Sequence, residues 1–473
     1  MVLDNLEPKR VFEIFEEISQ IPHGSYNTQK IADYIESFGK RLNLNTIRDK
    51  YNNIIIKKPK TADSASDTPV IIQGHMDMVC AKDEKCDINL ETDALRLDCD
   101  GEYVFAKGTT LGADDGIALA YALAILEADD IAHPPIECVF TVDEEVGMLG
   151  ANALDMSNLQ GKYLLNIDSE VEGEFCVSCA GGATVKAIMP IKKTDNDYQS
   201  TVKIEISGLL GGHSGVEIDK GRANANILMG ELLKEISQYT AFDIVSMDGG
   251  QKDNAIPKSA CTVISTPDVE VIKRVAKNKE EEFSTRYKHT GDNIKISVSE
   301  VSKKQGYKSE ITRLLSAVTD GVREMSQYID NLVETSSNLG VIRTNNDSIT
   351  VTFSVRSSVN EKKTELINEI TGLSKECGCD VEVSGEYPPW EYSRNSRLQE
   401  LCKRVYKEQY GKEPEIMAIH AGLECGIFAS KISGLQCISF GPNLLDIHTT
   451  NERMEIKSVE RVFEFLKAIL KEI

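Results

Sequence analysis

The stretch V-I-I-Q-G-H-M-D at residues 70–77 decides the fold assignment, because an apolar strand pattern runs directly into two polar side chains. Side chains two positions apart point to the same side of an extended chain, so His75 and Asp77 are expected to project together. The carboxyl ends of parallel strands carry the ligand crevices of α/β proteins. A metal-binding imidazole usually donates its other N–H to a carboxylate, and Asp77 fits that task. Taken alone, the stretch fits a surface His–Asp pair equally well.

Further polar clusters have the same relation to predicted strands and helices. They are G-A-D-D-G at 112–116, before an apolar helix at 115–128, D-E-E at 143–145, after a strand at 137–142, and D-S-E at 168–170, after a strand at 163–167. One such turn is usually a helix cap or a solvated loop. Clusters at this many strand ends are harder to explain as caps, because packed carboxylates repel one another.

Divalent metal ions are the simplest partners for these carboxylates. Two ions about 3.5–4 Å apart can share a carboxylate and activate a water molecule together. His448 follows another predicted strand, at 436–440, and brings a second imidazole from the C-terminal segment. A glutamate beside a ligand would then take a proton from the water.

The order of predicted elements indicates two kinds of domain. Residues 1–182 and 388–473 alternate helices with apolar strands, which predicts a mostly parallel α/β sheet with helices on both faces. Residues 183–387 alternate polar and apolar positions in their strands, as an antiparallel sheet does, and have predicted helices that include 308–327. We therefore predict an α/β domain interrupted by an inserted α+β domain.

Composition and charge exclude several classes of protein. The 473 residues carry 53 Lys and Arg against 75 Asp and Glu, a net charge of −22 that disfavours nucleic acid as a partner. The longest apolar run, 117–126, is shorter than the roughly 20 residues of a membrane span. The N-terminus has no signal-peptide pattern, and the 12 cysteines are scattered. These features favour a cytoplasmic protein with reduced thiols and no membrane partner.

Together, these motifs resemble the dinuclear zinc metallopeptidase family that includes carnosinases, aminoacylases and glutamate carboxypeptidases. The family patterns are G-H-x-D, G-A-D-D-G, D-E-E-x-G, N-x-D-S-E and a late G-P followed by a histidine. The stretches at 109–114, 211–215 and 419–426 are most similar to its aminoacyl-histidine dipeptidase branch. The resemblance covers essentially the whole chain and implies a parallel-sheet catalytic domain with an inserted lid and dimerisation domain.

The resemblance also implies roles in a two-metal centre. One metal would be bound by His75 and Asp168, the other by Glu145 and His448, with Asp114 as the bridge between them. Asp77 would orient His75, and Glu144 would be the general base and acid. Zinc is the expected metal, and cobalt and manganese are alternatives because these ligand types accept all three.

In the inserted domain, the resemblance implies substrate contacts. His213 would stabilise the oxyanion, Arg356 would bind the C-terminal carboxylate of the substrate, and Asn254 would be a polar lid contact. From the residues alone, these are equally a glycine turn, a strand charge and a turn residue. In the C-terminal segment, Glu424 would meet the free amino group of the substrate. Lid closure and a homodimer formed through the lid are also implied.

The predicted activity is therefore hydrolysis of dipeptides with a free N-terminus, preferentially Xaa-His, by a metal-bridging hydroxide that Glu144 activates. A tripeptide aminopeptidase and an N-acyl-amino-acid deacylase share the same metal set and stay open as alternatives. A non-catalytic metal-binding protein is a further alternative. The motifs do not define the strictness of the histidine preference, the cleavage of carnosine-like dipeptides, or the roles of His420 and Trp390.

Overall fold

The computed structural model describes residues 2–64 and 66–473, which form two compact units. The terminal unit consists of Met1–Cys179, Tyr392–Ala418 and Leu423–Ile473, and the inserted unit of Ala180–Glu391 and Ile419–Gly422. The short second segment belongs to the inserted unit because the Ala180 N–H donates to the carbonyls of Ile419 (3.1 Å) and Ala421 (3.0 Å). The domain boundaries expected from sequence, 1–182, 183–387 and 388–473, stay predictions.

The terminal unit is built on an eight-stranded sheet in the order β1-β2-β6-β3-β7-β23-β8-β22. Its centre is parallel, since β3 pairs in parallel with β6 and β7, and β7 with β23. The bounds are β1 Asn45–Arg48, β2 Ile54–Lys58, β3 Val70–His75, β6 Ile136–Thr141, β7 Tyr163–Asn166, β8 Glu174–Cys179, β22 Glu415–Ile419 and β23 Gln436–Ser439. Every residue of β3 and β6 is buried, which agrees with their apolar sequences.

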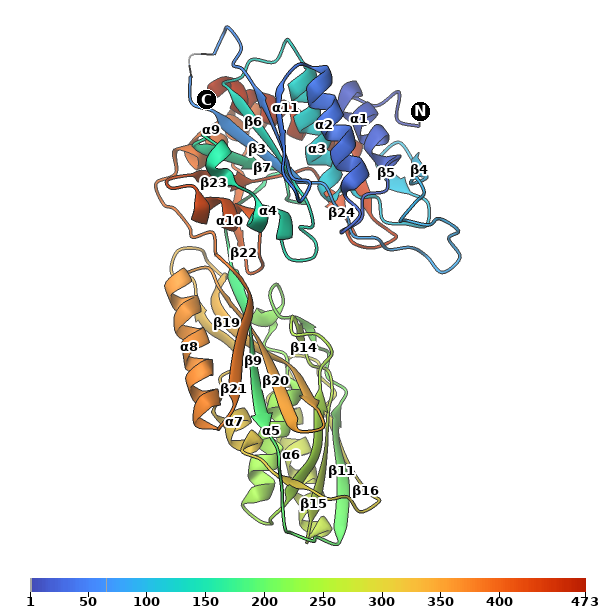
Figure 1. Cartoon of the computed structure of the whole chain (residues 1–473), viewed down its shortest axis with the longest axis vertical. Coiled ribbons are helices and arrows are strands. Elements are labelled where there is room, and N and C mark those ends of the chain that lie inside the picture. Colours follow the sequence, from blue (N-terminus) through green and yellow to red (C-terminus); the bar gives the residue numbers. More distant parts are fainter. Residues whose placement is uncertain (1, 65) are drawn as a thin grey trace. The chain divides into compact units, whose positions relative to one another are not determined.

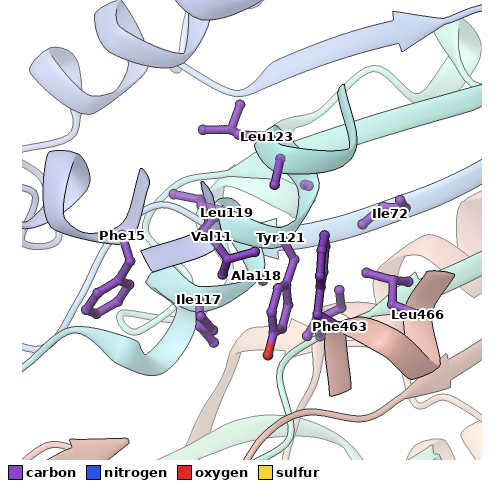
Figure 2. Packing of buried hydrophobic residues seen from close by; sticks show 14 of the residues in the cluster. Val11, Phe15, Ile72, Ile117, Ala118, Leu119, Tyr121, Leu123, Phe463 and Leu466 are labelled. Atoms are coloured by element: carbon purple, nitrogen blue, oxygen red, sulfur yellow. The ribbon is translucent and has the colours of Figure 1, made fainter. Parts of the chain in front are cut away.

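Helix α3 (Ala113–Glu127) is the central helix of this unit. All residues from 115 to 126 are buried, because the Ala- and Leu-rich sequence has no polar face. Its Tyr121 ring stacks on Phe463 with centroids 5.5 Å apart, and its hydroxyl donates to the Val459 carbonyl at 2.9 Å. Figure 2 shows these side chains in one core with Val11 and Phe15. The N-terminal and C-terminal segments are thereby packed onto the same helix.

Other helices of the terminal unit cover its sheet and close the chain. They are α1 Lys9–Ser19, α2 Gln29–Arg41, α4 Leu149–Ala153, α9 Arg397–Tyr410, α10 Glu424–Lys431 and α11 Ile456–Glu472. A smaller sheet, in the order β24-β25-β5-β4, consists of Leu444–Leu445, Arg453–Glu455, Tyr103–Ala106 and Leu97–Cys99. Among the described residues, no helix is both long enough and apolar enough to cross a lipid bilayer.

The inserted unit has its own antiparallel sheet and its own core. Its main path is β16-β11-β15-β13-β19-β20-β9-β21. The bounds are β9 Gly181–Pro190, β11 Ser200–Ser207, β13 Asp243–Gly249, β15 Ala260–Thr266, β16 Lys295–Val301, β19 Val333–Thr344, β20 Ser348–Ser357 and β21 Asp380–Tyr387. Helices α5 Ala225–Ser237, α6 Val269–Arg286, α7 Ile311–Ala317 and α8 Asn360–Glu376 accompany it (Figure 1). The α5 residues Leu228 and Leu232 are fully buried in this core.

One predicted helix of the inserted unit is wrong. The helical pattern at 308–327 is divided into the short α7 and the strand β18 (Gly321–Met325), which pairs with β19. Gly321 has a φ of +87°, a conformation that breaks a helix and that glycine adopts without strain. Pairing with a long neighbouring strand therefore prevails over the local helical spacing.

Candidate active site

The predicted metal ligands lie at one edge of the terminal unit's sheet. His75 ends β3, and Asp114 is the second residue of α3. Glu145 follows β6, Asp168 follows β7, and His448 lies in the loop between β24 and β25. The His75 side chain is fully buried, whereas that of His448 is 43% exposed. The parallel strands thus bring His75, Glu145 and Asp168 to the same place. Asp114 and His448 join them from the start of α3 and from a loop of the smaller sheet.

The carboxylate of Asp114 is shared between the two histidines. Its Oδ1 lies 3.1 Å from His75 Nε2, and its Oδ2 lies 3.0 Å from His448 Nε2. His75 Nε2 is also 3.7 Å from Asp168 Oδ1. His448 Nε2 is 2.9 Å from Glu145 Oε1. The five side chains therefore form two sets, each with one histidine and one carboxylate, joined through Asp114.

The donor atoms of this cluster fit divalent metal ions. Ligand atoms of His75, Asp114 and Glu145 lie within 4.8 Å of one another. The Glu145 Oε1 atom is buried and forms no hydrogen bond, although it faces an imidazole nitrogen. Imidazole and carboxylate donors are the usual ligands of zinc and similar ions. A pair of cations would neutralise this otherwise repulsive group of carboxylates.

The pKa values reflect the crowding of charges in the metal-free chain. The hydrogen bond to Asp114 and the adjacent carboxylate of Glu145 raise the pKa of His448 to about 10. Burial raises the pKa of Asp168 to about 6, although His75 opposes the shift. Binding of a cation needs neutral imidazoles and ionised carboxylates, so metal binding would release protons from this cluster.

Asp77 contacts more than the imidazole that it was predicted to orient. His75 Nδ1 lies 2.9 Å from the backbone carbonyl of Asp77 and 3.6 Å from its carboxylate. The carboxylate accepts the backbone N–H groups of Glu144 (2.9 Å) and Glu145 (3.4 Å) and the hydroxyl of Ser25 (2.8 Å). Asp77 therefore holds both the histidine and the loop that carries the two glutamates.

Glu144 and Glu424, near the cluster, both have raised pKa values. Burial, together with nearby carboxylates such as Asp168, raises the pKa of Glu144 well above its usual value. Burial also raises the pKa of Glu424 to about 8. Glu424 Oε2 accepts the Thr141 hydroxyl at 2.6 Å and the Gln73 amide, whereas its buried Oε1 has no hydrogen-bond partner. Carboxyl groups with raised pKa values are suited to proton transfer near neutral pH.

In the inserted unit, His213 and Asn254 are joined by a short two-stranded pairing. Strand β12 (Gly212–His213) pairs with β14 (Ala255–Ile256), and the Ser214 N–H donates to the Asn254 carbonyl at 2.9 Å. Both residues line a cavity of about 1150 Å³. The His213 Nδ1 accepts two backbone N–H groups at 3.2 Å, and burial lowers the pKa of the ring. The neutral ring consequently carries its proton on Nε2, which is then a hydrogen-bond donor.

Arg356 lies on β20 of the same unit, away from any acidic partner. Its Nη1 donates to the Tyr387 hydroxyl at 3.0 Å, and its buried Nε has no hydrogen-bond partner. Among the described residues, no carboxylate forms an ion pair with it. Burial lowers the pKa of His420 to about 3, and Arg356 contributes to that shift. A nearly buried guanidinium beside neutral imidazoles is suited to binding an anion.

Asp115 belongs to the sequence motif at 112–116, which predicts no role for it. Its Oδ2 accepts a hydrogen bond from the backbone N–H of His75 at 3.2 Å. Possible ligand atoms of Asp115, His75 and Asp168 lie within 4.8 Å of one another. A Cβ atom at Gly74 would lie 2.6 Å from the same Oδ2, so glycine is required there. The doubled aspartate and the neighbouring glycine were the available signals for this contact.

Comparisons with known proteins agree with the geometry. The family model described as peptidase family M20/M25/M40 matches residues 71–472. The chain is 34% identical over 479 aligned residues to the cytosol non-specific dipeptidase of Escherichia coli, covering 100% of this chain and 99% of that protein. It has a TM-score of 0.92 and 34% identity to the aminoacylhistidine dipeptidase of Vibrio alginolyticus, covering 100% and 98% of the two chains.

A more distant structure shows that the fold is shared more widely. The aminopeptidase PepT of Bacillus cereus has a TM-score of 0.60 at 20% identity, covering 99% of each chain. The predicted α/β architecture with an inserted α+β part is confirmed by these likenesses. The resemblance inferred from the motifs is likewise confirmed: the chain belongs to the M20/M25/M40 family of peptidases.

Proposed function

We propose that this peptidase is a dipeptidase that uses two divalent metal ions and hydrolyses dipeptides with a free N-terminus, preferentially Xaa-His. The observation that carries the proposal is the Asp114 carboxylate, with one oxygen facing each of two histidines at 3.1 and 3.0 Å. The full-length likeness to two proteins named as dipeptidases supports the substrate class. Their two names, one non-specific and one aminoacylhistidine, make histidine selectivity the feature most in need of a test.

The metal ions would be bound by two sets of side chains that share a bridge. One set is His75 with Asp168, and the other is Glu145 with His448. Asp114 would belong to both. Zinc is the expected metal, with cobalt or manganese as alternatives. When bound, the ions would polarise the scissile carbonyl and lower the pKa of a water molecule.

Glu144 and His213 would assist the reaction directly. Glu144 would take the proton of the attacking water and return it to the leaving amine, a transfer suited to its raised pKa. His213 would donate from Nε2 to the oxygen that gains negative charge, because its Nδ1 is already engaged by two backbone N–H groups. Asp77 would keep His75 and Glu144 in position through the contacts described above.

The two ends of a dipeptide would be recognised by groups of opposite character. Arg356 would bind the terminal carboxylate, and Asn254 would add a polar contact. Glu424 would meet the terminal amine, whose positive charge would favour ionisation of this carboxyl group.

In the same proposal, the protein acts in the cytoplasm as a homodimer formed through the inserted unit. Light scattering tests the dimer directly, and a single monomeric species would contradict it.

A hydrolysis panel on metal-loaded protein tests the activity. It compares Xaa-His dipeptides, carnosine, other dipeptides, a tripeptide and an N-acetyl amino acid. Rapid cleavage of Xaa-His dipeptides with slow cleavage of the rest is expected. Equal rates on all dipeptides would remove the histidine preference, whereas faster cleavage of the tripeptide or the acetyl substrate would assign a different activity. Metal binding without cleavage of any substrate would favour a metal-binding protein.

A further inference from the structure

Glu452 is a buried carboxylate that none of the proposed roles uses. It lies at the end of the loop that carries His448, directly before β25, and is 3% exposed. Its side chain contacts a segment about 340 residues earlier in the chain. A carboxylate is costly to bury unless its oxygens accept several hydrogen bonds. The partners of Glu452 therefore indicate what its burial achieves.

Three consecutive backbone N–H groups donate to Glu452. Its Oε2 accepts from Leu111 (2.8 Å) and Gly112 (3.2 Å), and its Oε1 accepts from Ala113 (2.8 Å). These residues directly precede Asp114, and Gly112 has a φ of +69° at the start of α3. Ala113 is the first residue of α3, so its N–H has no partner within the helix, and Leu111 and Gly112 lie directly before the helix. Glu452 supplies the partner for all three N–H groups from another part of the chain.

The hydrogen bonds to Glu452 also fix the backbone that leads into Asp114. They occupy the N–H groups of residues 111–113, the three positions directly before Asp114. The two Asp114 oxygens face His75 and His448, at 3.1 and 3.0 Å. Glu452 therefore holds the chain segment from which the proposed bridging carboxylate projects.

The loop between His448 and Glu452 is held by internal hydrogen bonds. The Thr449 hydroxyl donates to the Asp446 carbonyl at 2.7 Å, and the Glu452 N–H donates to the Thr449 carbonyl at 3.2 Å. His448 has a φ of +60°, so its backbone takes the left-handed conformation. Because the loop is short and internally hydrogen-bonded, fixing the position of Glu452 also restrains the position of His448.

We propose that Glu452 is a positioning residue that fixes Asp114 opposite His448 before any metal ion binds. One carboxylate holds the Asp114 segment, and the loop that bears this carboxylate also bears His448. The inference rests on the proposed metal centre, because it assigns Asp114 and His448 as ligands. Its consequence is that the spacing of these two ligands belongs to the metal-free chain and does not arise on metal binding.

Two measurements on full-length Glu452→Gln test this role. In metal-free protein, hydrogen exchange by mass spectrometry should show faster exchange at residues 109–114, since an amide cannot accept all three N–H groups. Competition with a chromophoric chelator should show zinc binding weakened by about 10–100-fold, the usual effect of losing a group that orients ligands. Glu460→Gln, on the exposed side of α11 beside Lys457, is the matched control and should behave as wild type.

The outcomes separate this inference from the proposed function. Unchanged zinc affinity and unchanged exchange in Glu452→Gln would overturn it. If the wild-type protein bound no zinc, the proposed metal centre would fail, but the exchange result would still show whether Glu452 holds the segment. If Glu452→Gln did not fold, Glu452→Asp would be used, which keeps the charge but shortens the reach. Rapid exchange at 109–114 in folded, metal-free wild type would also overturn the proposal.

Discussion

The two units of the chain gather polar side chains of opposite character. At the predicted metal site of the terminal unit, carboxylates outnumber the two histidines, and burial raises the pKa of Asp168 and of Glu424. In the inserted unit, Arg356 has neutral His213 and His420 nearby, and burial lowers the pKa of both rings. The first arrangement favours cations and the second favours an anion. In the proposed function, metal binding and recognition of the substrate carboxylate are therefore assigned to different units.

The side chains that hold the proposed site residues in place also differ in charge between the two units. In the terminal unit, the carboxylates of Asp77 and Glu452 accept backbone N–H groups beside the proposed ligands. In the inserted unit, the Asn338 amide donates to the carbonyls of Asp253 (2.7 Å) and Ala255 (3.0 Å), on either side of Asn254. Negative supports add to the field that attracts a metal ion, whereas an amide holds a loop without adding charge. Each unit is therefore supported by groups that suit its proposed ligand.

The largest effect is expected for Glu144→Gln. The amide cannot take a proton from water, so kcat should fall by about 10²–10⁴-fold, the usual contribution of a general base. Zinc content, measured on the same samples, should stay at the wild-type level, because Glu144 is not a proposed ligand. Glu464→Gln, on the exposed face of α11, is the control. A near-normal kcat would show that Glu144 is not the base.

His213→Ala tests whether the inserted unit contributes to chemistry as well as to binding. Removal of one donor to a developing oxyanion usually lowers kcat by about 10²–10³-fold. KM and zinc content should change little, because the ring belongs to the other unit. His289→Ala, at an exposed position of the inserted unit, is the control. Loss of zinc from His213→Ala would contradict the separation of the two units' roles.

Arg356→Lys tests the anion-binding side of the comparison. A lysine keeps the charge but loses the paired N–H groups of a guanidinium, so KM should rise by about 10–100-fold with a smaller change in kcat. Arg323→Lys, which retains a charge beside its surface partner Glu369, is the matched control. An unchanged KM would assign carboxylate recognition to another residue.

The metal-binding edge was largely predictable from sequence because its signals are local. Each proposed ligand follows a short apolar strand or begins an apolar helix, and parallel strands bring such positions together. The strands predicted at 70–73, 137–142 and 436–440 correspond to β3, β6 and β23. The assigned roles stay predictions, whereas the proximity of the side chains is observed.

The remaining contacts depend on residues far apart in sequence. Nothing near Glu452 indicates that its carboxylate binds the N–H groups of 111–113, and the motif at 112–116 does not reveal that partner. The strand β18 was hidden within a helical pattern, because its pairing with β19 is a tertiary effect. Periodicity reports which face of an element is buried, but it does not report which distant group receives its hydrogen bonds.

The smallest effect is expected for Asp320, a buried carboxylate of the inserted unit, and concerns the pH dependence of stability. Burial raises the pKa of Asp320 from 3.8 to about 6, although its Oδ1 accepts the Leu339 N–H (2.6 Å) and the Asn224 amide (3.1 Å). Between these pH values, the folded chain holds a proton that the unfolded chain has released. The free energy of unfolding therefore falls as pH rises from about 4 to 6, by at most about 3 kcal/mol from this group.

Asp320→Asn should remove this dependence while keeping an oxygen that can accept both hydrogen bonds. Urea unfolding of metal-free protein should show the variant gaining stability over wild type as pH rises through 4–6, with a constant difference above pH 6. Asp197→Asn is a control with the opposite sign and a lower pH window, because hydrogen bonding to Lys303 lowers the pKa of Asp197 below 3.8. That variant should lose stability relative to wild type as pH rises toward about 4, with a constant difference through pH 4–6. A difference that did not vary with pH would show that Asp320 is ionised in the folded chain. The contrast between the units would then be weaker, because a buried anion would lie within the unit assigned to anion binding.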